Sequence, residues 1–182
     1  RELVDAACAA AGLTLYVERL AGRLRGPDFQ ARARLQRYDL ARELAARHEY
    51  GPLVTAHNRD DQAETVLYRL VKYASPLGLA GMRPREGNLA RPLLGAGADD
   101  IRAYCAARGV AYRVDASNLE PVYARNVSRL EVRPALARLN PRVGETLADA
   151  AAIAAAEADV VAAAVDAAWE RASVEPRAGE LA

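Results

Sequence analysis

The stretch that most constrains the fold is LVTAHNRDDQAET, residues 53–65. Its first four residues are mostly apolar and partly β-branched, as in a buried parallel strand. Beyond the stretch, apolar residues recur at helical spacing, at Val66, Leu67, Leu70, Val71 and Ala74. The pattern predicts a strand, a tight polar turn and a helix. In open α/β sheets, ligands bind at the carboxyl ends of such strands, so the polar turn is the first place to look for a site.

The turn carries several acids, and two interpretations compete for them. Asp61 and Glu64 are three residues apart, which places both carboxylates on one side of the first helical turn. Such a pair can cap the helix, where the helix dipole favours negative charge. It can also hold a divalent cation that bridges to nucleotide phosphates. His57 and Asp60 lie in the same turn, and a cap needs only one carboxylate, so the cluster modestly favours a site.

The run from His57 to Thr65 resembles the HHxDDQAET signature of the tRNA(Ile)-lysidine synthetases, which belong to the PP-loop (N-type ATP pyrophosphatase) family. Four further segments resemble motifs of that family in the right order: LAGM at 79–82, RPLL at 91–94, DASN at 115–118 and RNVSR at 125–129. The resemblance covers roughly residues 30–141. One short motif is weak evidence, whereas five in order are specific.

Two features depart from the family pattern. Asn58 stands where the family usually has a second histidine. The Ser-Gly-Gly-x-Asp-Ser loop that cradles the ATP phosphates in the family is absent from the sequence. We therefore expect the chain to be a fragment that begins after this loop, and to bind ATP weakly or not at all by itself.

The resemblance implies a two-step ligation that uses ATP and Mg²⁺. The C2 oxygen of the wobble cytidine of an isoleucine tRNA (CAU anticodon) is adenylated, and the ε-amine of free lysine then expels AMP. In this reaction Asp61 is expected to bind the metal, Glu64 to orient or deprotonate the lysine, and Arg129 to stabilise developing charge. The residues expected to bind ATP or substrate are His57, Asp60, Arg125 and Asn126. Those expected to bind tRNA are Arg32, Arg34 and Arg37. The resemblance also leaves a homodimer open.

Other functions are compatible with parts of the pattern. The arginines between residues 19 and 37 can form a solvated helix face as readily as a phosphate-facing patch. The formal net charge of +1 argues against a wholly basic nucleic-acid binder, although not against a local basic face. A related PP-loop thiolase is the second hypothesis, but Cys8 and Cys105 form no C-x-x-C pair. A non-catalytic RNA-binding fragment is the third.

The remaining pattern alternates helix and strand, which predicts an α/β fold with a parallel, Rossmann-like sheet of the adenine nucleotide alpha hydrolase type. The predicted helices cover 2–11, 29–50, about 60–74, 99–108, a segment from about 125, and 144–172. The predicted strands cover 13–20, 53–56, 90–94 and 110–114. Loops are predicted at 21–27, 75–78, 84–88 and 115–123, and breaks at Arg133-Pro134 and Asn140-Pro141.

The domain organisation follows from this alternation. We expect a catalytic domain over residues 1–143, and a linker helix with a tail over residues 144–182. The sequence contains no signal peptide and no 18-residue apolar run without charge, so we expect no membrane association and a cytoplasmic protein.

Overall fold

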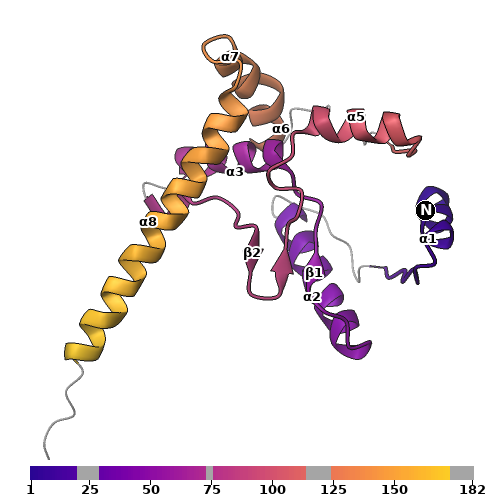
Figure 1. Cartoon of the computed structure of the whole chain (residues 1–182), viewed down its shortest axis with the longest axis horizontal. Coiled ribbons are helices and arrows are strands. Elements are labelled where there is room, and N and C mark those ends of the chain that lie inside the picture. The colour runs from indigo at the N-terminus through magenta and orange to yellow at the C-terminus, as the bar shows by residue number, and fades with distance from the viewer. Residues whose placement is uncertain (20–28, 73–75, 114–123, 173–182) are drawn as a thin grey trace, which may run out of the picture.

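The computed structural model describes residues 1–19, 29–72, 76–113 and 124–172. The helices, in chain order, are α1 (Glu2–Ala10), α2 (Phe29–Arg47), α3 (Arg59–Lys72), α4 (Pro76–Leu79), α5 (Ala98–Arg108), α6 (Ala124–Val127), the π-helix η2 (Ser128–Val132), α7 (Arg133–Ala137) and α8 (Val143–Ala172). The strands are β1 (Leu53–Val54), β2 (Arg85–Glu86) and β3 (Leu89–Ala90). Figure 1 shows α8 running along one side of the molecule, across α3.

The strands form a small mixed sheet in the order β1-β3-β2. β1 pairs with β3 in parallel, and β2 pairs with β3 antiparallel through a two-residue turn. Gly87 in that turn has φ 56°, the left-handed conformation that tight hairpin turns need. The buried guanidinium of Arg91 holds the hairpin by donating to the Arg83 carbonyl at 2.7 Å and to Glu86 at 3.2 Å. The RPLL segment therefore has a structural role.

Several predicted strands are wrong. Residues 13–19 and 110–113 are described without strand pairing, so the predictions over 13–20 and 110–114 fail in the parts that the structure describes. A strand needs a hydrogen-bonding neighbour, which an apolar alternation cannot guarantee. The strand predicted over 90–94 ends at Ala90, because Pro92 begins a turn, and the loop predicted over 84–88 contains β2.

The helix predictions are mostly confirmed. α1 ends before Gly12, which has φ 65°, and α5 ends at Gly109, which has φ 62°. The N-cap of α5 is Gly97, where Asp99 or Asp100 was predicted. α2 ends at Arg47, three residues earlier than predicted, and Glu49 then takes a left-handed φ of 54°.

The break predicted at Arg133-Pro134 is wrong, because the chain stays helical from Ala124 to Ala137. Pro134 is separated from the π turn η2 by one residue and lies at the start of α7, so the change of helix type occurs next to the proline. The break predicted at Asn140-Pro141 is confirmed, since α7 ends at Ala137 and α8 begins at Val143. The predicted loops at 21–27 and 115–123, the DASN turn at 115–118 and the tail after 172 lie outside the described residues.

The core is small and centred on α3. Its buried apolar side chains are Ala63, Val66 and Leu67 of α3, with Met82, Leu94 and Ala151. Ala151 is fully buried, so α8 approaches α3 through small side chains. Because α8 packs on the same core, the division at residue 143 into two functional parts stays a prediction. None of the helices in the described ranges is both long and apolar enough to cross a bilayer.

Candidate functional site

The start of α3 is fixed by a reciprocal cap between Asn58 and Asp61. The Asn58 side chain accepts the Asp61 N–H at 3.0 Å, and the Asp61 carboxylate accepts the Asn58 N–H at 3.0 Å. Such a capping box satisfies two orphan donors at once. The cap therefore uses Asn58 and Asp61, whereas the sequence suggested Asp61 and Glu64. The residue that replaces the family's second histidine acts as the helix cap.

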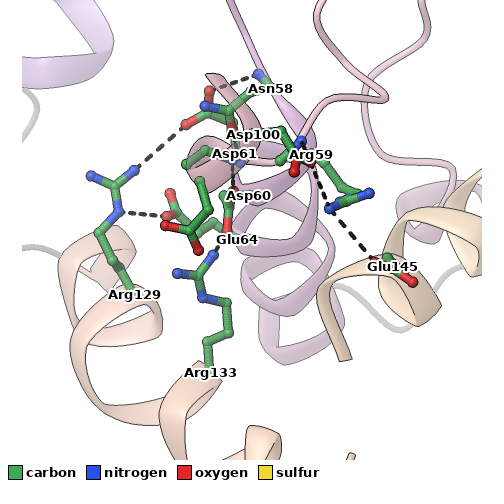
Figure 2. A network of polar contacts seen from close by, with 12 residues as sticks. Asn58, Arg59, Asp60, Asp61, Glu64, Asp100, Arg129, Arg133 and Glu145 are labelled. Carbon is green, nitrogen blue, oxygen red and sulfur yellow. Dashed lines mark hydrogen bonds and ion pairs between the residues drawn. The ribbon is translucent and has the colours of Figure 1, made fainter. Parts of the chain in front are cut away.

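Asp61 and Glu64 also bind two arginines that lie more than 60 positions later in the chain. Arg125 donates from Nε to Glu64 Oε2 at 2.7 Å and from Nη2 to Asp61 Oδ1 at 2.5 Å. Arg129 donates from Nε to Glu64 Oε1 at 2.6 Å, and its Nη2 lies 3.6 Å from Asp61 Oδ1. Figure 2 shows the Arg129 side chain directed at this acidic turn of α3. Two of the five motifs that carried the resemblance, the signature and RNVSR, therefore meet in space.

The burial of Glu64 makes its pairing with the two arginines necessary. The Glu64 side chain is fully buried, and each of its oxygens accepts from a different guanidinium. A buried carboxylate needs such pairing, because an unpaired charge away from water is very costly. The pKa of Arg125 is raised from its ordinary value. Burial alone would lower that pKa, but the hydrogen bond to Glu64 and the charges of Asp61 and Glu64 outweigh it.

Asp60 points to a different set of partners. One of its oxygens forms an ion pair with Arg133, and the other accepts the backbone N–H of Ala98 at 2.6 Å, at the start of α5. Burial lowers the pKa of Arg133 from its ordinary value. The neighbouring Arg59 lies 3.5 Å from Asp100 and 3.6 Å from Glu145 (Figure 2). Asp60 thus joins α3, α5 and α7.

His57 lies beside the cluster, at the carboxyl end of β1. Its Nδ1 is 2.8 Å from the Thr55 hydroxyl. Its pKa is lowered, first by burial and then by the positive charge of Arg34, with smaller effects of the same sign from Arg91 and Arg125 and an opposing one from Asp61. The ring is therefore neutral near pH 7.

A cavity of about 440 Å³ opens here, between α2, the end of β1 and the start of α3. The residues that line it are Arg37, Tyr38, Ala41, Leu53, Thr55, Ala56, His57, Asp61 and Arg125. Of the arginines predicted to bind tRNA, Arg37 lies in this cavity wall, Arg34 sits 5.4 Å over the Tyr38 ring, and Arg32 is exposed on the same helix. Asn126, predicted to bind ATP or substrate, is buried beside Arg125.

Sequence reasoning missed the role of Gln62. Its buried amide donates to the Met82 carbonyl at 2.9 Å and accepts the Met82 N–H at 2.8 Å. Gly81 has φ 57°, and a Cβ there would lie 2.6 Å from Gln62 Nε2. The signature and the LAGM segment therefore form one contact. The glycine of the LAGM segment is the only sequence signal for it.

The carboxylates do not form a metal centre as they lie. In the part of the chain that the structure describes, no group of three or more His, Cys, Asp or Glu side chains is arranged to hold a metal ion. Both oxygens of Asp61 are engaged, one by Arg125 and the other by the Asn58 amide. The expectation that Asp61 binds Mg²⁺ therefore stays a prediction, and this donor set does not favour it.

Known proteins are similar to this chain over the region that contains the site. The family model described as a PP-loop domain matches residues 1–136. A tRNA(Ile)-lysidine synthase of Salinispora arenicola is 47% identical over 137 residues, which cover 72% of this chain and 40% of that protein. A tRNA(Ile)-lysidine synthase of Symbiobacterium thermophilum is 47% identical over 121 residues, which cover 64% of this chain and 24% of that protein. The chain thus spans well under half the length of these curated relatives.

Among solved structures, a U34-tRNA thiolase from Methanococcus maripaludis, determined with its 4Fe-4S cluster, superposes with a TM-score of 0.62. The match covers 82% of this chain and 54% of that one, at 13% identity. At that identity the likeness concerns the fold alone. The predicted α/β fold class with a long C-terminal helix is confirmed, with the correction that the sheet is small and mixed.

Proposed function

The chain belongs to the PP-loop domain family, and from that premise we propose that it is the catalytic part of an enzyme that attaches free lysine to the wobble cytidine of an isoleucine tRNA at the expense of ATP. The relatives named tRNA(Ile)-lysidine synthase support this assignment, at 47% identity over the region that they share. The chain covers only part of those proteins, so the activity, ATP, lysine and the tRNA are all elements of the proposal.

The observation that carries the proposal is the meeting of the signature acids with the arginines of the RNVSR motif at the rim of a cavity. Arg125 and Asp61 both line that cavity, and Arg129 reaches the same two acids from the next turn. Adenylation of the cytidine oxygen requires positive charge at the α-phosphate. The planar fork of arginine suits phosphate oxygens because it donates two parallel hydrogen bonds. We assign that role to Arg125 and Arg129.

The acids hold these arginines in place. Glu64 uses both oxygens to fix the two guanidinium groups, so we assign it the orientation of Arg125 and Arg129, in place of the orientation or deprotonation of lysine expected from the sequence. Asp61 fixes Arg125 from the other side and caps α3. A preorganised pair of cations stabilises developing charge without reorganising during the reaction.

His57 supplies a neutral ring to the cavity. We assign it to contacts with ATP or the cytidine, because it lines the same wall as Arg37 and Asp61. In this proposal Arg32, Arg34 and Arg37 of α2 form the surface that docks the tRNA. Arg37 also lines the cavity, and Arg32 and Arg34 lie earlier on the same helix.

The remaining elements of the proposal are Mg²⁺, a cytoplasmic location and a homodimer. Mg²⁺ would accompany ATP and neutralise phosphate charge, but the described carboxylates do not fit an ion held by the protein alone. A cytoplasmic location fits a tRNA substrate. A homodimer stays a prediction.

The direct test is mass spectrometry of the substrate. The intact protein is incubated with ATP, lysine and an isoleucine tRNA that has a CAU anticodon. We expect the anticodon fragment to gain the mass of lysine less one water, and to gain nothing when ATP or lysine is omitted. In a parallel reaction that also contains a sulfide donor, a gain equal to the mass of sulfur less that of oxygen would support a thiolase instead. No change in mass, with tRNA binding retained, would leave only an RNA-binding role.

A further inference from the structure

Three arginines spaced four residues apart, Arg125, Arg129 and Arg133, face acids of α3. Arg125 and Arg129 reach Asp61 and Glu64, whereas Arg133 pairs with Asp60. The three arginines thus meet three acids of the first turns of α3, and Figure 2 shows Arg129 and Arg133 among these acids.

A regular α-helix would not keep all three arginines on the face that meets α3. With 3.6 residues per turn, each step of four overshoots a full turn by about 40°, so two steps rotate the third side chain by about 80°. The wider π turn at Ser128–Val132 contains the second arginine, Arg129, and ends at the residue before Arg133, and it takes back part of that rotation. π turns recur at functional sites, and here the turn returns Arg133 to the face that α3 presents.

The Arg133–Asp60 contact lies apart from the cavity. Neither residue lines the cavity that holds His57, and both line a second hollow beside α5 and the start of α8. Their side chains are 28% and 23% exposed. An exposed pair would contribute little, whereas a pair this far from solvent is screened less. Asp60 is also held by the Ala98 amide at a helix N-terminus, where negative charge is favoured.

We propose that Asp60 and Arg133 are a positioning pair, which anchors the helical segment 124–137 to α3 and so sets where Arg125 and Arg129 lie. The inference rests on the proposed function. It moves Asp60 from the ATP- or substrate-binding set expected from the sequence to a role that acts through the two arginines. Asp60 belongs to α3 and also accepts the Ala98 N–H of α5, so the position of its carboxylate is fixed by both helices.

The first test measures the anchoring itself, independently of any reaction. Hydrogen exchange of the backbone amides of residues 124–132 is followed in the intact protein and in Arg133→Ala, Arg133→Lys and Asp60→Asn. We expect exchange at least tenfold faster in Arg133→Ala and Asp60→Asn, and close to wild type in Arg133→Lys. Arg138→Ala is the matched control, because Arg138 is an exposed arginine at the end of α7 and has no ion pair among the described residues. Unchanged exchange in Arg133→Ala would overturn the proposal.

The second test reads the consequence for the reaction. With lysine transfer to tRNA as the assay, Arg133→Ala should lower kcat at least tenfold, with KM for ATP and tRNA within twofold. Arg133→Lys should recover most of the loss, and Arg138→Ala should match wild type. A change in KM for tRNA alone would make Arg133 a docking residue and refute positioning. If wild type itself transfers no lysine, the proposed function fails, and the exchange rates still decide whether the pair anchors the segment.

Discussion

Asp61 performs two tasks with its two oxygens. Oδ2 caps α3 by accepting the Asn58 N–H, and Oδ1 holds Arg125. An amide oxygen in place of the carboxylate can still accept the Asn58 N–H, as glutamine does in a capping box, but the substitution removes the charge that fixes Arg125. The cap and the charge can therefore be separated by a single substitution.

Asp61→Asn should change the free energy of unfolding by no more than about 1 kcal/mol and should abolish ATP-dependent release of pyrophosphate. Urea unfolding and a pyrophosphate assay measure the two quantities. Asp39→Asn is the control, because Asp39 forms a surface pair with Arg42 at 3.0 Å. A large loss of stability with pyrophosphate release intact would show that Asp61 is only a cap.

His57 predicts how stability responds to acid. Its folded pKa lies below the ordinary value of about 6.5, because the ring is partly buried and close to Arg34. As pH falls through about 6.5, His57 binds a proton in the unfolded chain but not in the folded one. The free energy of unfolding therefore falls with pH from there down to the folded pKa. Above about 6.5 both states are neutral and the ring has no effect.

His57→Gln should therefore flatten the dependence of unfolding free energy on pH just below about 6.5. Urea titrations at several pH values test this, with His48→Gln removing the other histidine for comparison. Identical slopes for wild type and His57→Gln would contradict the assignment.

At this scale the sequence predicted that the acids share one turn of a helix, but not all of their contacts. Asp61 and Glu64 could be placed on one side of a helix because their spacing is local. That Glu64 is buried under Arg125 and Arg129 depends on segments more than 60 residues away, and only the resemblance suggested that they meet. The Asp60 contact with Arg133 and the Gln62 contact with Met82 have no local signal, because they depend on how α3 packs against later segments.

At the scale of elements, the segment 80–83 is fixed to α3 by one glycine and one glutamine. Gly81 has a left-handed φ and admits the Gln62 side chain, which then pairs with both backbone groups of Met82. The next residue, Arg83, holds Asp159 of α8 by two hydrogen bonds of 2.7 Å. This short segment therefore contacts both α3 and α8, in addition to the direct packing of these two helices.

Gly81→Ala tests the contact between Gln62 and the segment 80–83, with Gly87→Ala as the comparison. Both glycines have φ near 57°, so both variants lose about 1 kcal/mol to left-handed strain. A Cβ at Gly87 would meet only open space, whereas a Cβ at Gly81 would displace Gln62 and break two buried hydrogen bonds. We expect Gly81→Ala to cost about 2 kcal/mol more than Gly87→Ala in denaturant unfolding. Equal costs would show that Gln62 moves aside freely.

The helices were more predictable than the strands, for a physical reason. Helix ends are set by neighbouring residues, such as Gly12 and Gly109, whose left-handed φ stops α1 and α5. A strand exists only if another segment pairs with it. The apolar runs at 13–19 and 110–113 resemble strands but find no partner in the described structure, whereas Arg85–Glu86, which looked like loop, pairs with β3.

For the whole molecule, the main expectation concerns two sets of arginines. Arg125 and Arg129 are assigned to the reaction, and Arg32 and Arg34 to docking of the tRNA. Alanine at the first pair would leave the buried Glu64 unpaired, so lysine is the better replacement, since it keeps the charge and loses the planar fork.

In the intact protein, the pair Arg125→Lys and Arg129→Lys should reduce lysine transfer far more than tRNA affinity. Arg32→Ala with Arg34→Ala should do the reverse, with weaker binding, a flatter dependence on salt and nearly normal single-turnover rates. Filter binding at several salt concentrations and rapid-quench assays measure these effects. If both pairs change only the affinity, the division between the two sets is wrong.

The length of α8 carries its last turns well beyond the core. Its 30 residues measure about 45 Å at 1.5 Å per residue. The buried residue Ala151, where α8 packs in the core, lies about 31 Å along the helix from its end at Ala172. A tilt of the helix by about 2° at Ala151 therefore displaces that end by about 1 Å. The last turns carry the exposed side chains of Val165 and Trp169, so the position of these two side chains is set by the angle at which α8 leaves the core.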